Sequence, residues 1–286
     1  MKPAPFEYAR PGSVTEAIDA LSEGGFGAKL LAGGQSLIPA MNFRLAQPEL
    51  LIDLGNLDEL RGIRECEHGG LMIGAMTTHR EVERSELVAR HTPLLAEVMP
   101  WIAHAQIRNR GTLGGSLAHA DPAAELPSVM QVLGAVLHAR GPDGERTIPV
   151  DDFYVGLFTT DLEPDELLTA IEIPPIAAGS RCAFEEVARR HGDFALVGVA
   201  VIIEPDEGGA IKGARISLLS VGEGPVLAER AMEGLVGRTL SDEAIRAAAR
   251  EAAEDLDPPD DIHASPEFRR HLAEVLTARA LQRVRV

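Results

Sequence analysis

Residues 108–127 read RNRGTLGGSLAHADPAAELP, and this stretch places a cluster of glycines between two arginines and a segment that reads like a helix. Glycines this dense usually mark a place where something comes very close to the backbone. A second cluster, AGGQS at 32–36, follows directly after the apolar segment KLL. In each cluster a Gly-Gly pair is followed by serine, either at once or one residue later.

Glycine loops of this kind let several backbone N–H groups converge on one concavity, which suits phosphate oxygens. Because there are two such loops, far apart in the sequence, they suit a ligand with two linked phosphates better than one with a single phosphate. The alternative is that the glycines only form tight turns, and the residues alone leave both interpretations open. Neither a P-loop nor a Rossmann fingerprint occurs, so a dinucleotide would have to bind by another architecture.

Composition narrows the class of protein. The 286 residues predict about two domains. With 27 basic and 44 acidic residues, the formal net charge is −17, so nucleic acid and anionic membrane surfaces are not expected partners. Cys66 and Cys182 are isolated, which predicts neither a disulfide framework nor a metal site. No apolar leader and no long apolar run occurs, so we expect a cytoplasmic protein without a membrane span.

Residues 1–55 predict a small parallel strand–helix–strand unit. Its helix is expected to begin with a capping box, Ser13 with Glu16, and its strands are the short apolar segments AKLL and LLIDL. Residues 56–176 predict a larger mixed unit with a hairpin around a Pro-Asp-Gly turn. The helix predicted over 92–105 should turn five side chains inward, namely Leu94, Leu95, Val98, Trp101 and Ile102.

The pattern changes near residue 177. Residues 181–190, 194–205 and 214–222 predict a three-stranded antiparallel sheet, and two or three helices follow it. Ser241 and Ser265 are the expected N-caps of the last two helices. Residues 177–286 are therefore predicted as a separate C-terminal domain, and the whole chain as an α+β protein.

Four segments together carry a family resemblance: AGGQSLIP at 32–39, RLAQPELLIDL at 44–54, GAMTTH at 74–79 and the opening stretch at 108–127. This combination resembles the FAD-binding medium subunits of xanthine-oxidase-type molybdenum hydroxylases. That group includes aerobic carbon monoxide dehydrogenase and dehydrogenases of quinoline, nicotine and purine type. The resemblance spans essentially the whole chain. It implies a two-part FAD-binding domain of the vanillyl-alcohol-oxidase-like (PCMH) type over 1–176, and a carbon-monoxide-dehydrogenase-flavoprotein-like domain over 177–286.

The resemblance also implies that the FAD pyrophosphate lies on both glycine motifs. The matching residues of the first motif are Lys29 at its mouth and then Leu31, Ala32, Gly33, Gly34, Gln35, Ser36 and Leu37. Those of the second motif are Thr112, Gly114, Gly115 and Ser116. Many carbon monoxide dehydrogenases have histidine at the place of Gln35, so this form fits the branch that oxidises heterocycles better.

Four further positions match the family's FAD contacts. Glu125 matches an acid that binds the adenosine ribose hydroxyls, and its alternative is a solvated acid at a helix start. Ile102 and Leu168 match apolar positions that pack on the flavin, and without the family both would be ordinary core residues. Phe194 stands where relatives often have a tyrosine beside the isoalloxazine ring, so any hydrogen bond from that hydroxyl is lost.

Two arginines precede the second motif. Arg108 and Arg110 suggest phosphate contacts, but ion pairing at an interface or a helix end is the favoured interpretation. Lys29 is also consistent with an ordinary surface lysine. No histidine has metal-ligand spacing, and no Ser–His–Asp set or general-base pair is found. We therefore expect no catalytic residue and no metal ligand in this chain.

The activity that the resemblance implies is that of a FAD-containing electron-transfer subunit. It would take electrons from [2Fe–2S] clusters of a small subunit while a large molybdopterin subunit hydroxylates an N-heteroaromatic or carbon-monoxide-type substrate. Relatives form a dimer of heterotrimers. One alternative is a free-standing flavin oxidase of the vanillyl-alcohol-oxidase type, which would need a base over the flavin and usually a larger cap domain. The other is a flavin-free scaffold.

Overall fold

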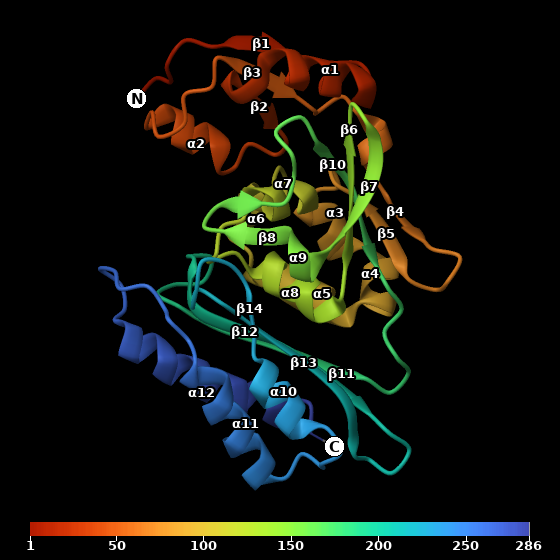
Figure 1. Cartoon of the computed structure of the whole chain (residues 1–286), viewed down its shortest axis with the longest axis vertical. Coiled ribbons are helices and arrows are strands. Elements are labelled where there is room, and N and C mark those ends of the chain that lie inside the picture. The colour runs from red at the N-terminus through yellow and green to blue at the C-terminus, as the bar shows by residue number, and fades with distance from the viewer. Residues whose placement is uncertain (286) are drawn as a thin grey trace.

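The computed structural model describes residues 1–285, and Figure 1 shows an elongated molecule with the N-terminal unit at one end and the C-terminal helices at the other. Helices and strands are mixed throughout, as the sequence predicts. No helix within residues 1–285 has both the length and the apolar character needed to cross a lipid bilayer.

The N-terminal unit is built on a parallel sheet with the strand order β1-β3-β2. Its elements are β1 (Glu7–Ala9), α1 (Val14–Gly24), the 3₁₀ turn η1 (Gly25–Gly27), β2 (Ala28–Leu31), α2 (Leu37–Asn42) and β3 (Leu50–Asp53). The Ser13 hydroxyl accepts from the N–H of Glu16, but the Glu16 carboxylate accepts from the N–H of Gly12 and not from that of Ser13. The predicted capping box is therefore only half formed.

The middle unit contains an antiparallel sheet of five strands, in the order β4-β5-β10-β6-β7. Its strands are β4 (Ile63–Glu65), β5 (Leu71–Gly74), β6 (Val136–Gly141), β7 (Gly144–Pro149) and β10 (Leu167–Ile173), and a separate hairpin pairs β8 (Tyr154–Gly156) with β9 (Thr159–Thr160). Its helices are η2 (Asp58–Leu60), α3 (His79–Arg84), α4 (Glu86–His91), α5 (Pro93–Val98), η3 (Met99–Trp101), α6 (Ala105–Arg108), α7 (Leu113–His119), α8 (Glu125–Leu133) and α9 (Val150–Phe153).

The single helix predicted over 92–105 is divided in the structure. Helix α5 ends at Val98, and a 3₁₀ turn over Met99–Trp101 replaces its continuation. Proline at position 100 explains the break, because it has no N–H to donate to the preceding turn. The change of direction leaves Trp101 exposed, so its predicted inward orientation is wrong, whereas Ile102 is buried.

The C-terminal sheet has four strands and not the predicted three, in the order β11-β12-β13-β14. Its elements are β11 (Arg181–Ala188), β12 (Ala195–Pro205), β13 (Ile211–Leu219), β14 (Val226–Leu227), α10 (Glu229–Leu235), α11 (Asp242–Glu254) and α12 (Pro266–Arg283). The extra strand spans two residues, too few to show an alternating pattern in the sequence. Ser241 and Ser265 cap α11 and α12 as predicted.

The C-terminal sheet is covered on both faces. Helices α10 and α12 pack on one face, and α5 and α8 of the middle unit pack on the other. Neighbouring residues therefore belong to different cores: Ala183 lies in the C-terminal core, whereas Phe184 lies in the middle core. A strand with both faces buried reads as a continuous apolar run, which explains the sequence ALVGVAVII in β12. This packing fixes the C-terminal sheet against the loop that precedes α8.

Candidate functional site

The two glycine motifs, far apart in the sequence, touch each other in the structure. A Cβ atom added to Gly33 would lie 2.2 Å from the carbonyl oxygen of Arg110 and 2.7 Å from the Cα of Gly111. A Cβ added to Gly115 would lie 3.1 Å from the Cβ of Ala32. The two distances at Gly33 are shorter than real contacts allow, so glycine is required at position 33 for one motif to pack on the backbone of the other.

The first motif keeps its backbone N–H groups free. Within residues 1–285, none of the N–H groups of residues 33–37 has a hydrogen-bond acceptor, although the carbonyls of Gly34 and Ser36 accept from the following helical turn. Gln35 turns its side-chain amide back onto the carbonyl of Gly33. Gly34 adopts a φ of +71°, in the left-handed region that favours glycine. Successive free N–H groups around such a bend form an anion-binding nest.

The second motif is different, because Leu113–His119 is helix α7 and not the loop that the sequence predicts. The N–H groups of its first turn are all paired within the protein. Leu113 donates to the carbonyl of Thr77 at 3.0 Å, and Gly114 donates to that of Ala75 at 2.9 Å. The N–H groups of Gly115 and Ser116 donate to the hydroxyl and the carbonyl of Thr112. These amides hold the chain itself, and the free donors of this motif are side-chain hydroxyls.

A cavity of about 340 Å³ opens beside the first motif. Its lining includes Asp53, Arg110 and several residues of the motif, namely Leu31, Ala32, Gly33, Gly34, Gln35, Ile38 and Pro39. Arg110 lines this cavity, a place that the favoured sequence interpretation did not assign to it. The only indication in the sequence is that Arg110 directly precedes Gly111. Arg108, in contrast, is buried and pairs with Glu83 at 3.2 Å, which is the helix-end ion pair that was predicted.

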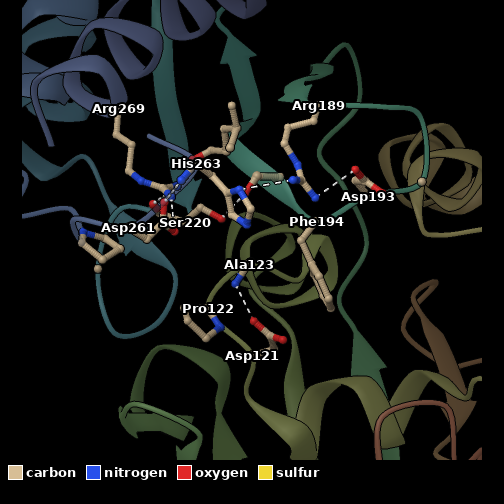
Figure 2. Close-up of a pocket in the computed structure, with 15 residues that line it drawn as sticks. Asp121, Pro122, Ala123, Arg189, Asp193, Phe194, Ser220, Asp261, His263 and Arg269 are labelled. Atoms are coloured by element: carbon tan, nitrogen blue, oxygen red, sulfur yellow. Dashed lines mark hydrogen bonds and ion pairs between the residues drawn. The ribbon is translucent and has the colours of Figure 1, made fainter. Parts of the chain in front are cut away.

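A larger cavity of about 460 Å³ lies between the loop before α8, the β11–β12 loop and the segment before α12. Figure 2 shows Phe194 and Asp121 on its walls. Arg189 contacts His263 at 3.2 Å and Asp193 at 3.3 Å, so these polar walls come from the C-terminal part of the chain. Phe194 is 64% exposed, and its ring is available to a flat ligand. Sequence reasoning found Phe194 but missed these polar neighbours, which lie far apart in the sequence.

Two family descriptions cover nearly the whole chain. Residues 4–176 match the FAD binding domain in molybdopterin dehydrogenase, and residues 182–284 match the CO dehydrogenase flavoprotein C-terminal domain. The chain belongs to this flavoprotein family. It is therefore the FAD-binding component of a molybdenum-dependent oxidoreductase.

Individual relatives agree in sequence and in structure. The chain is 43% identical over 289 residues to the 6-hydroxypseudooxynicotine dehydrogenase complex subunit alpha of Paenarthrobacter nicotinovorans, over 100% of this chain and 97% of that one. A structure of carbon monoxide dehydrogenase from Hydrogenophaga pseudoflava superposes with a TM-score of 0.97 at 41% identity, over 99% and 98% of the two chains. Quinoline 2-oxidoreductase from Pseudomonas putida 86 gives a TM-score of 0.94 at 41% identity, over the same shares.

The residues at the first motif fit the diphosphate of FAD. The free N–H groups of residues 33–37 offer donors, and Arg110, a cationic residue, lines the same cavity. Ser36 is exposed beside them. This donor set suits a doubly charged group better than an apolar ligand, because it supplies charge compensation without a metal ion.

The remaining predicted FAD residues, Lys29, Ile102, Leu168 and Glu125, are not among the residues that line the two cavities. Lys29 is exposed on β2 and lines neither cavity. Ile102 and Leu168 are buried at 7% and 6% exposure. Glu125 is also buried, at the first position of α8, so the alternative of a solvated acid is wrong.

Glu125 is one of two buried carboxyls behind the larger cavity. Burial raises the pKa of Glu125 to about 7, and the nearby charge of Asp121 adds to this rise. Burial, and then the charge of Glu125, raise the pKa of Glu186 to about 8. One carboxylate oxygen of Glu186 has no hydrogen-bond partner within residues 1–285. Glu186 was not predicted, since a single acid in a strand pattern gives no signal in the sequence.

Proposed function

We propose that this chain carries the FAD of a heterotrimeric molybdenum hydroxylase and passes electrons from iron–sulfur clusters to an external acceptor. The observation that carries the proposal is the run of unpaired N–H groups over residues 33–37 on the wall of a cavity that Arg110 also lines. In this proposal those groups hold the diphosphate. FAD, when bound, supplies the electron-accepting isoalloxazine ring, and the protein supplies position and charge.

Roles for the other residues follow from their places. Thr112 and Ser116 would donate from their hydroxyls, because the backbone amides of residues 113–116 are already used. Leu31, Ala32, Leu37, Gly114 and Gly115 would line the path of the diphosphate, with Lys29 near its mouth. Glu125 would meet ribose hydroxyls. Ile102, Leu168 and Phe194 would pack on the flavin, and the exposed ring of Phe194 supports this last role.

The proposed partners are a small subunit with [2Fe–2S] clusters and a large molybdopterin subunit, assembled as a dimer of heterotrimers. Exposed aromatic surface supports permanent partners. Of the eight phenylalanines, Phe153 and Phe184 are buried, whereas the others are exposed, namely Phe6, Phe26, Phe43, Phe158, Phe194 and Phe268. Large apolar side chains at the surface are typical of interaction sites. A free-standing flavin oxidase would need a cap domain, and the chain instead spans 97% of a relative that is named as a subunit.

We further propose an N-heteroaromatic substrate for the assembled enzyme. Relatives are named for nicotine, caffeine and quinoline as well as for carbon monoxide, and glutamine at position 35 supports the heterocycle branch. We also propose that residues 1–176 form a two-part FAD-binding domain of the vanillyl-alcohol-oxidase-like type, divided near residue 55. Residues 177–286 would form the C-terminal domain. Cytoplasmic location belongs to the proposal as well, because Cys66 and Cys182 are free thiols.

The test is to produce the chain alone and with its expected partners. The chain alone should be yellow, should release about one FAD per chain on heating, and should contain no iron. Copurification from the native host should add iron and molybdenum, and turnover of N-heterocycles against carbon monoxide would then decide the substrate. A correctly folded, colourless chain that takes up no added FAD would refute the proposal.

A further inference from the structure

His79 holds the second glycine motif by both its backbone and its side chain. Its backbone N–H donates to the carbonyl of Gly111 at 2.8 Å, and its ring Nε2 lies 3.0 Å from the carbonyl oxygen of Thr112. Since a carbonyl can only accept, Nε2 carries the ring proton and Nδ1 is left with a lone pair. That Nδ1 is buried and has no hydrogen-bond partner within residues 1–285.

The ring is neutral in the folded protein. Burial lowers the pKa of His79 to about 4, the bond to Thr112 opposes this fall, and the charge of Arg108 adds to it. A Cβ added to Gly111 would lie 3.1 Å from Nδ1. Gly111 therefore packs against the Nδ1 and Cε1 atoms of the imidazole, and this contact explains the first glycine of the motif.

Contacts continue from this ring to the first motif. His79 packs on Gly111, and Gly33 packs on Gly111 and on the carbonyl of Arg110. Any shift of residues 110–112 would therefore displace the loop whose N–H groups are free, together with Arg110, which lines the same cavity. Two more hydrogen bonds, from Leu113 to Thr77 and from Gly114 to Ala75, fix the far side of this segment.

We propose that His79 is a positioning residue of the diphosphate site. It does not touch the ligand, but its backbone N–H holds the carbonyl of Gly111 and its Nε2–H holds the carbonyl of Thr112. These two carbonyls fix residues 111–113, and this segment sets the place of residues 33–37 and of Arg110. The ligand class is a nucleotide with two linked phosphates, such as FAD or ADP. This inference rests on the proposed function.

The test compares His79→Leu, which keeps the volume but removes the donor, with His79→Gln, which keeps a side-chain N–H. Binding of FAD, ADP and adenosine is measured on the full chain by calorimetry and flavin fluorescence. His79→Leu should weaken FAD and ADP alike by about tenfold or more, a cost of about 1.4 kcal/mol, and should leave adenosine unchanged. His79→Gln should restore most of the loss. His68→Leu, an exposed histidine, is the matched control.

The outcomes separate the two proposals. A wild-type chain that binds neither FAD nor ADP would refute the proposed function itself. If the wild type binds both and His79→Leu binds them equally well, only the positioning role is overturned. A merely structural role would lower the melting temperature and weaken adenosine and ADP equally. Should His79→Leu fail to fold, Gly111→Ala replaces it, because its methyl group would press on Nδ1 and should weaken ADP without affecting adenosine.

Discussion

The two glycine motifs are similar in sequence, yet their backbone N–H groups differ in whether they have hydrogen-bond acceptors. Residues 33–37 leave their N–H groups without acceptors, whereas the first turn of α7 donates to Ala75, Thr77 and Thr112. In the proposed function the first motif is the receptor for an anion, and the second motif is a support on which that receptor is built. A glycine cluster therefore indicates that another group comes close to the backbone, but it does not distinguish a ligand from another segment of the chain.

The largest effect is expected from Gly33→Ala. The added methyl group would lie 2.2 Å from the carbonyl oxygen of Arg110, and neither backbone can move without opening the contact between the motifs. We expect the purified chain to lose FAD almost completely, by a factor of about a hundred or more in affinity. The ratio of flavin to protein absorbance measures this loss.

Gly12→Ala is the control for Gly33→Ala, because its methyl group would meet only the Glu16 carboxylate, at an ordinary 3.4 Å. That variant should stay yellow. A Gly33→Ala chain with full flavin content would mean that FAD binding does not need the contact between the two motifs. The second motif would then not be the support of the first.

Arg110→Ala should weaken FAD and ADP by about tenfold, since a charge-assisted bond to phosphate contributes about 1.5–3 kcal/mol. Arg110 is exposed, so the melting temperature of the FAD-free chain should not change. The loss should shrink as salt is added, because exposed charges are screened. Titration with ADP at low and high salt measures this, and Arg64→Ala, an exposed arginine on β4, is the control. Unchanged ADP affinity would show that Arg110 does not contribute to binding of the diphosphate.

Thr112→Val tests the supporting motif. Its hydroxyl accepts from the N–H of Gly115 and caps α7, and loss of such a cap costs about 1 kcal/mol. For a chain of this size the melting temperature should fall by about 2–4 °C, while FAD affinity should fall less than in Arg110→Ala. Thermal unfolding of the FAD-free chain and FAD titration give the two numbers. Thr112→Ser should restore both. A loss of FAD as large as that in Arg110→Ala, without loss of stability, would mean that the Thr112 hydroxyl serves the ligand and not the helix cap.

Much of the fold was readable from local pattern, because helix caps, apolar periodicity and glycine stops act within a few residues. The α1 helix ends at Gly24 with Gly25 at a φ of +50°, as its sequence predicts. The two-residue strand β14 and the turn at Trp101 were not readable, since tertiary packing and one proline decide them. The sequence motifs name the glycines and hydroxyls of the candidate site. Arg110, His79 and Glu186 were not predicted as part of it, because their contacts are with residues distant in the sequence. Only the assembled chain shows which amides remain free.

The smallest effect concerns pH, and it should arise at the buried carboxyl of Glu186 on β11. The pKa of Glu186 is raised from 4.5 to about 8, first by burial and then by the charge of Glu125. The native chain therefore keeps a proton that the unfolded chain releases, so the free energy of unfolding falls as pH rises from about 4.5 to about 8. Glu186→Gln removes this loss and should melt a few degrees above the wild type at pH 8.5, but close to it at pH 5.

Glu185→Gln gives the contrast on the same strand, because its carboxylate pairs with Arg283 at 3.0 Å. That variant should gain nothing at pH 8.5. FAD affinity should be unchanged in Glu186→Gln at either pH, since the donors proposed for the diphosphate are backbone amides, which do not titrate. If Glu186→Gln instead melted equally with the wild type at both pH values, the carboxyl would be charged in the folded chain. Water would then reach the Glu186 carboxyl more readily than its burial indicates.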